Sequence, residues 1–171
     1  MHTVRLGRAP GDRRARRKTG DCPNGHGGAA ECPGRSGGGA TLTEGPQGVR
    51  ILLTIAKLPP GRHGFHIHAV GACDPPTFAS AGGHFNPADG KQHGWMNQAG
   101  AHGGDLPHLT VGPDDSARME MYAPRVTLAE GPQSLMRPGG TSLVIHAGPD
   151  DEVTDPSGNS GDRIACRIIR K

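Results

Sequence analysis

The chain has 171 residues, which is enough for one domain with its own hydrophobic core. Hydrophobic residues make up only 33% and aromatic residues 3%, whereas glycine and proline number 29 and 16. This composition excludes a helical bundle and favours short strands joined by many turns, supported by metals or a disulfide. No apolar run approaches the length that spans a membrane.

Residues 1–38 differ in character from the rest of the chain. They carry eight Lys or Arg against three Asp or Glu, including the cluster Arg13–Lys18, and they end in glycines. Because they offer few apolar side chains to bury, we expect a disordered, basic segment. No apolar stretch follows the basic residues, as a signal peptide requires, and no aromatic residues mark a nucleic-acid surface. Cys22 and Cys32 flank His26, a weak hint of a metal clip.

From residue 39 the pattern predicts a folded domain that runs to residue 171. Val49, Ile51, Leu53 and Ile55 alternate with other residues, as in a strand with one buried face. Turn residues separate this strand from its neighbours, and no helix is predicted. The architecture that follows is an antiparallel sandwich or barrel. The seven predicted strands are Ala40–Thr43, Val49–Ala56, the segment around His66 and His68, Leu106–Val111, Ala117–Tyr122, Thr141–Ala147 and Arg163–Ile169.

Residues 64–105 hold five of the ten histidines. His66 and His68 are two positions apart in a strand, so their rings leave the same face of the sheet. A long loop without apolar periodicity follows and carries three further histidines and a carboxylate. Such a loop has little core of its own, which indicates that a metal holds it. These loop residues are His84, His93, His102 and Asp105.

The ligand types point to two different metals. Three histidines with one aspartate match the closed tetrahedral set of a structural zinc site. A set of imidazoles built on a His-x-His pair suits copper instead. Near the end of the chain, His146 closes an apolar run and Asp150 follows it four residues later, which adds one more imidazole and a carboxylate.

Five motifs together resemble the copper/zinc superoxide dismutase family, in its bacterial form. They are GFHIH, GGHFNP, the later His93 with His102-Gly-Gly-Asp105, LVIHAGPDD and GNSGDRIAC. The resemblance covers about residues 39–171. It implies an all-β, Greek-key antiparallel barrel or sandwich of seven to eight strands, with long metal-binding and electrostatic loops.

Carried over position by position, the resemblance implies two metal sites that share one imidazole. His84 becomes the bridge between copper and zinc. The implied copper ligands are His66, His68, His84 and His146, and the implied zinc ligands are His84, His93, His102 and Asp105.

The resemblance also implies roles around the metals. Asp150 matches the carboxylate that hydrogen-bonds one histidine of each site. Arg163 matches the arginine beside copper that guides and holds superoxide. Cys73 and Cys166 match the intrasubunit disulfide. His63 matches a structural histidine, and His108, which has no counterpart, is expected on a strand surface. With His84 as the proton-accepting bridge, the catalytic residues are Arg163 and His84.

The implied function is an oxidoreductase that converts superoxide to oxygen and hydrogen peroxide by copper redox cycling, with a structural zinc. The alternative is a copper chaperone or metal store on the same fold, but such relatives typically lose part of the copper set. A hydrolytic zinc enzyme needs an open coordination position, which three histidines with Asp105 do not leave.

The family further implies superoxide as substrate, a homodimer, and a periplasmic or extracellular location, which a disulfide favours. Neither nucleic acid nor a membrane span is expected. Three departures from the family pattern stand out. The first family strand has only Thr3–Leu6 as a candidate before Ala40, Arg167 replaces the glycine that usually follows the second cysteine, and the loop between His146 and Arg163 is acidic.

Overall fold

The computed structural model describes residues 3–5, 37–88 and 90–170. In these ranges the chain forms nine strands and a single 3₁₀ turn, η1, at Ala79–Ala81. No described helix is long and apolar enough to cross a membrane. The strands are β1 (Thr3–Arg5), β2 (Gly37–Gly45), β3 (Gly48–Ala56), β4 (Gly61–His63), β5 (Phe65–His68), β6 (Leu109–Val111), β7 (Ser116–Ala123), β8 (Thr141–His146) and β9 (Arg163–Ile169).

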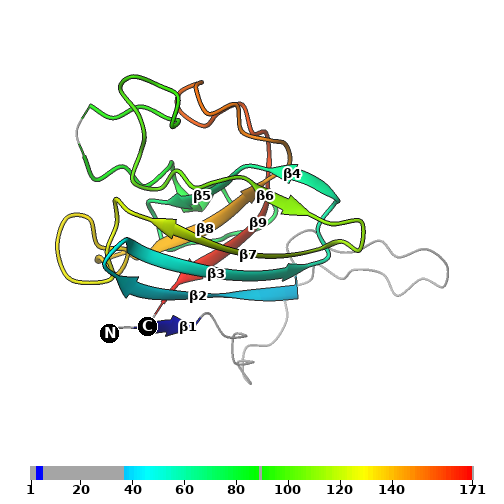
Figure 1. Ribbon diagram of the computed structural model, residues 1–171, viewed down its shortest axis with the longest axis horizontal. Coiled ribbons are helices and arrows are strands. Elements are labelled where there is room, and N and C mark those ends of the chain that lie inside the picture. Colours follow the sequence, from blue (N-terminus) through cyan, green and yellow to red (C-terminus); the bar gives the residue numbers. More distant parts are fainter. Residues whose placement is uncertain (1–2, 6–36, 89, 171) are drawn as a thin grey trace.

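Two antiparallel sheets pack face to face (Figure 1). The first has the strand order β1-β2-β3-β7 and the second β5-β8-β9, while β4 and β6 form a separate pair. The alternation in β3 buries Val49, Ile51, Leu53 and Ile55 against the other layer. Phe65 on β5 belongs to the same core. The prediction of an all-β antiparallel sandwich or barrel is therefore confirmed.

The structure corrects the expected strand number and several strand boundaries. Nine strands are described where seven to eight were expected, because the segment around His66 and His68 is split into β4 and β5 and because β1 precedes β2. The split occurs at Gly64, whose backbone N–H donates to the carbonyl of Gly148 at 2.8 Å and whose carbonyl accepts from His146 N–H at 2.9 Å. At these bonds the hydrogen-bonding partner of the chain changes: β4 pairs with β6, whereas β5 pairs with β8. In addition, β6 begins at Leu109, not Leu106, and β8 ends at His146, not Ala147. Three strands are longer than expected: β2 is Gly37–Gly45, not Ala40–Thr43, β3 begins at Gly48, not Val49, and β7 is Ser116–Ala123, not Ala117–Tyr122.

The N-terminal strand β1 is a further difference. Thr3–Arg5 pairs with β2 across Thr41–Thr43, so the weak candidate Thr3–Leu6 does supply a short strand. The register stops opposite Thr41, next to an apolar pocket between the sheets. Most of the segment predicted to be disordered, residues 1–38, lies outside the described residues. The predicted metal clip of Cys22, His26 and Cys32 lies wholly outside them.

We expect a chain that starts at Gly37 to bind both metals within about twofold of the full chain, because all seven ligands of the implied copper and zinc sets lie beyond it. Losing the three-residue β1 should lower the melting temperature by roughly 2–4 °C, the shift for about 1 kcal/mol in a domain of this size. A longer β1, grafted so that it also pairs with Gly38–Ala40, should cover the pocket and raise the melting temperature. Metal titration checks the predicted metal binding, and thermal unfolding checks the predicted melting temperatures. Loss of metal binding on truncation would show that residues 1–36 help build the site.

Two long loops lie together at one end of the sandwich (Figure 1, green and orange). The first, residues 69–108, is held against β5 by backbone bonds: Ile67 N–H donates to the carbonyl of Gly104 and Phe85 N–H to that of Ile67, both at 2.8 Å. A side chain at Gly104 would collide with the Ile67 carbonyl, so only glycine permits this approach. The loop thereby delivers His84 and Asp105 beside the β5 histidines.

Candidate metal centre

Four imidazoles meet where β5, β8 and the first loop converge. His66 and His68 lie on the face of β5 opposite Phe65 and Ile67, and His146 is the last residue of β8. The ring centroids of His66 and His84 are 4.0 Å apart and those of His68 and His146 are 5.6 Å apart. All four side chains are buried or nearly so. We call His66, His68, His84 and His146 the four-histidine cluster.

Hydrogen bonds fix which nitrogen of each ring faces the centre of this cluster. Nδ1 of His68 lies 2.8 Å from the Gly82 carbonyl and Nδ1 of His146 lies 2.9 Å from the Gly161 carbonyl. Their Nε2 atoms are left 3.4 Å apart, facing inward. Nδ1 of His66 and Nε2 of His84 are buried without a hydrogen-bond partner among the described residues. Buried orphan nitrogens of this kind are explained by a bound cation.

A second group gathers around one carboxylate. Oδ1 of Asp105 lies 2.9 Å from His84 Nδ1, 3.0 Å from His93 Nδ1 and 3.4 Å from His102 Nδ1. Oδ2 accepts the backbone N–H groups of Gly94 and His102, both at 2.9 Å, which holds the carboxylate in place. We call His84, His93, His102 and Asp105 the Asp105 cluster. In each cluster the ligand atoms lie within 4.8 Å of one another, and His84 belongs to both.

Asp150 links the two clusters from outside. Its Oδ2 lies 2.6 Å from Nε2 of His66 and its Oδ1 lies 2.9 Å from Nε2 of His93. A carboxylate on the far nitrogen of a ligand histidine fixes the ring and its tautomer. Gly158 packs directly over this contact, since a Cβ there would collide with the Asp150 carboxylate.

Burial sets the protonation of the four-histidine cluster. It lowers the pKa of His66 to about 3, of His68 to about 2 and of His146 to about 4. Near neutral pH these rings are therefore uncharged and their lone pairs are free to bind a cation. Burial also acts to lower the pKa of His93, but hydrogen bonds to the carboxylates of Asp105 and Asp150 outweigh it and raise the pKa to about 9.

The two carboxylates are ionised. Burial alone would raise their pKa values, but hydrogen bonds from histidines hold the pKa of Asp105 and that of Asp150 well below the usual range. Negative charge beside a buried set of imidazoles favours occupation by a cation.

Arg163 lies at the edge of the four-histidine cluster. Its guanidinium donates to the carbonyls of Phe78 and Gly82, both at 2.7 Å, and Gly82 also holds His68. Partial burial lowers its pKa, yet an arginine stays charged. The disulfide Cys73–Cys166 ties the same segment of the first loop to β9, with Cα atoms 5.6 Å apart.

The two other histidines in the described part of the chain, His63 and His108, fall outside both clusters. The ring nitrogens of His63 lie 2.8 Å from the carbonyls of His146 and Pro59, consistent with a structural role. His108 was expected on a strand surface, which is wrong: it lies just before β6, half-buried, with Nε2 2.7 Å from Glu152 Oε1. Glu152 belongs to the second long loop, residues 147–162. Sequence reasoning also missed Asp155, whose Oδ1 accepts the N–H of His93 at 2.7 Å. No periodicity or motif marks these loop-to-loop contacts.

Comparison with known proteins agrees with this geometry. The family model described as copper/zinc superoxide dismutase (SODC) matches residues 36–169. The chain is 50% identical over 135 residues to "Superoxide dismutase [Cu-Zn] 2" of Aquifex aeolicus, covering 78% of each chain. The crystal structure of a SOD-like protein from Bacillus subtilis matches with a TM-score of 0.75 and 39% identity, covering 78% of this chain and 89% of that one.

A Cu/Zn superoxide dismutase from Brucella abortus matches with a TM-score of 0.63 and 32% identity, over 78% of this chain and 88% of that one. The family match spans nearly all of the folded domain, from the start of β2 to the end of β9. The chain belongs to the copper/zinc superoxide dismutase family.

Proposed function

We propose that the protein is a superoxide dismutase that uses copper and zinc. The observation that carries this proposal is the pair of buried ligand sets that share the His84 ring. Binding two cations through one ring requires both of its nitrogens to be available. Among the described residues, Nε2 of His84 is buried without a hydrogen-bond partner, and Nδ1 lies 2.9 Å from the carboxylate of Asp105.

The two clusters fit different metals. Four neutral imidazoles and no carboxylate suit copper, which we assign to His66, His68, His84 and His146. Three imidazoles with a carboxylate suit a closed tetrahedral zinc site, which we assign to His84, His93, His102 and Asp105. When bound, copper supplies reversible one-electron chemistry, whereas zinc has none.

The residues around the copper cluster would bind and orient the substrate. Two superoxide ions and two protons give one oxygen molecule and one hydrogen peroxide, so the site must admit an anion and deliver protons. Arg163 presents a fixed cation, oriented by the carbonyls of Phe78 and Gly82. Nε2 of His84 is placed to hold and release a proton, while Asp105 keeps the ring in position from its Nδ1 side.

A copper chaperone or metal store on the same fold is the second candidate, since one structural relative is named only as SOD-like. The complete four-imidazole set and Arg163 favour the enzyme. Metal-loaded protein should hold one copper and one zinc per chain and consume superoxide in a pulse-radiolysis or stopped-flow assay. Protein that is inactive when fully loaded, yet passes copper to an acceptor, would favour the chaperone.

Arg163 offers a test that separates substrate guidance from metal binding. Arg163→Ala should leave both metals bound but slow the reaction with superoxide roughly tenfold, the low end of the range for electrostatic steering. Arg163→Glu should slow it further because the charge is reversed, and Arg163→Lys, the matched control, should retain most of the rate. The contribution of Arg163 is measured from the rate constants of the variants at several ionic strengths and from the affinity of azide for the copper. Equal rates in all variants would place Arg163 away from the substrate path.

We further propose an oxidising location, periplasmic or extracellular, and a homodimer. The disulfide Cys73–Cys166 supports the location, since such bonds persist outside reducing compartments. Cell fractionation and sedimentation of the metal-loaded protein test the two proposals separately.

A further inference from the structure

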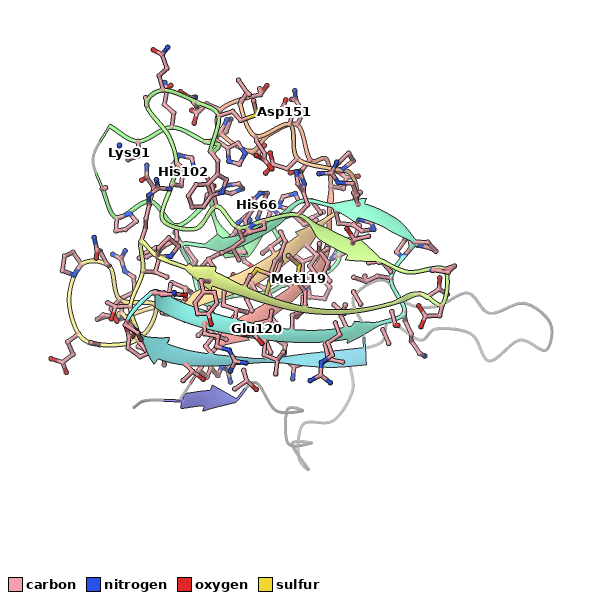
Figure 2. All side chains as sticks on the ribbon, in the orientation of Figure 1. His66, Lys91, His102, Met119, Glu120 and Asp151 are labelled. Carbon is pink, nitrogen blue, oxygen red and sulfur yellow. A yellow bond between two sulfur atoms is a disulfide. The ribbon has the colours of Figure 1, made fainter. Side chains whose placement is uncertain are left out.

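The second long loop, residues 147–162, lies over the zinc-binding part of the first loop, and Asp151 and His102 mark the two loops in Figure 2. One short stretch, residues 150–155, makes most of the contacts. The carbonyl of Glu152 accepts the N–H of Met96 at 3.2 Å, and the carbonyl of Val153 accepts from the Asn97 amide at 3.3 Å. The carboxylate of Glu152 meets His108. The stretch therefore fastens the loop that carries all four of the assigned zinc ligands.

Asp155, in this stretch, contacts two of the assigned zinc ligands, His93 and His102. Its Oδ1 accepts the backbone N–H of His93 at 2.7 Å and lies 3.7 Å from Nε2 of His102. On the other side of that ring, Nδ1 of His102 faces Asp105 Oδ1 at 3.4 Å and has no hydrogen-bond partner among the described residues. The His102 ring thus lies between two carboxylates, one on each nitrogen.

We infer that Asp155 is a positioning residue of the zinc site, which fixes the His102 ring and the backbone of His93 so that both present Nδ1 to the metal. The inference rests on the proposed zinc ligands. A carboxylate on the outer nitrogen of a ligand histidine selects the tautomer with its lone pair toward the metal and strengthens that ligand. Asp150 does this for His93 through a hydrogen bond of 2.9 Å, whereas Asp155 places its charge 3.7 Å from the same nitrogen of His102, an electrostatic contact longer than a hydrogen bond.

The exposure of Asp155 limits the size of the effect. Its side chain is 45% exposed, so water screens the charge, in contrast to Asp150 at 6%. We therefore expect a loss near the lower end of the roughly 10–100-fold range that removal of such partners causes in metal affinity.

Substitutions separate the two contacts. Asp155→Asn retains an oxygen that can accept the His93 N–H but removes the charge facing His102, whereas Asp155→Ala removes both. We expect zinc affinity to fall about tenfold in Asp155→Asn, at least as far in Asp155→Ala, and to recover partly in Asp155→Glu. The matched control is Asp162→Asn, which removes one exposed carboxylate from the same loop and should leave zinc affinity unchanged.

Zinc affinity is measured by competition with a chromophoric chelator, using Zn²⁺ itself as the probe. Cobalt substituted into the site gives absorption bands that report ligand geometry, and they should shift in Asp155→Asn but not in Asp162→Asn. His102→Ala, measured in parallel, should lose zinc binding. If His102→Ala loses zinc while Asp155→Asn matches Asp162→Asn in affinity and cobalt spectrum, the role of Asp155 is overturned and the zinc site stands. If His102→Ala keeps full zinc affinity, the zinc assignment fails and the inference fails with it.

Discussion

Replacing His146 by alanine should remove dismutase activity while the domain stays folded. The side chain is only 3% exposed and provides one of the four inward-facing imidazole nitrogens. Loss of a mere hydrogen-bond partner of a metal ligand already costs roughly 10–100-fold, so loss of a ligand should cost at least about a hundredfold. Zinc binding should persist, because the Asp105 cluster does not include His146.

The measurement is superoxide consumption per chain, together with copper and zinc content and far-UV circular dichroism. His108→Ala is the matched control: it removes a half-buried imidazole that belongs to neither cluster. It should retain copper and activity. A His146→Ala protein that kept copper and full activity would show that the four-histidine cluster is not the redox site.

Removing the Cys73–Cys166 disulfide should have the largest effect on stability. The bond spans 93 residues, and closing a loop of this length stabilises a domain by about 4–5 kcal/mol in the chain-entropy model. Typical domains are stable by only about 5–15 kcal/mol in total. The double substitution Cys73→Ser with Cys166→Ser should therefore bring the metal-free protein close to unfolding at room temperature.

Urea unfolding of the metal-free and metal-loaded forms measures this loss. Metal should recover part of it, because binding to the folded state alone stabilises that state. Activity of the loaded variant should also fall, since the disulfide anchors the segment whose carbonyls at Phe78 and Gly82 hold Arg163. A reducing agent should destabilise the wild-type chain to the same extent and leave the variant unchanged. Equal unfolding midpoints for variant and wild type would mean that the loop is held by its other contacts.

The strands and the faces of their side chains could be predicted from the sequence because they depend on local periodicity. Alternation in β3 and on β5 follows from a repeat of two, so the burial of Ile51 and the shared face of His66 and His68 could be predicted from neighbouring residues. The motifs around the histidines indicated the family, and the structure brings together every residue that the resemblance named for the two metal sets.

Contacts between distant, irregular segments were decided only by the tertiary structure. The division between β4 and β5 depends on Gly64 bonding to Gly148, which lies far along the chain. Asp155 reaches His93 across 62 residues, from one loop without periodicity to another. In such loops the backbone path is set by hydrogen bonds and close glycine contacts, not by a repeating pattern of apolar residues. For that reason the sequence predicted the candidate metal ligands and Asp150, whereas only the fold placed Asp155 beside His93 and His102.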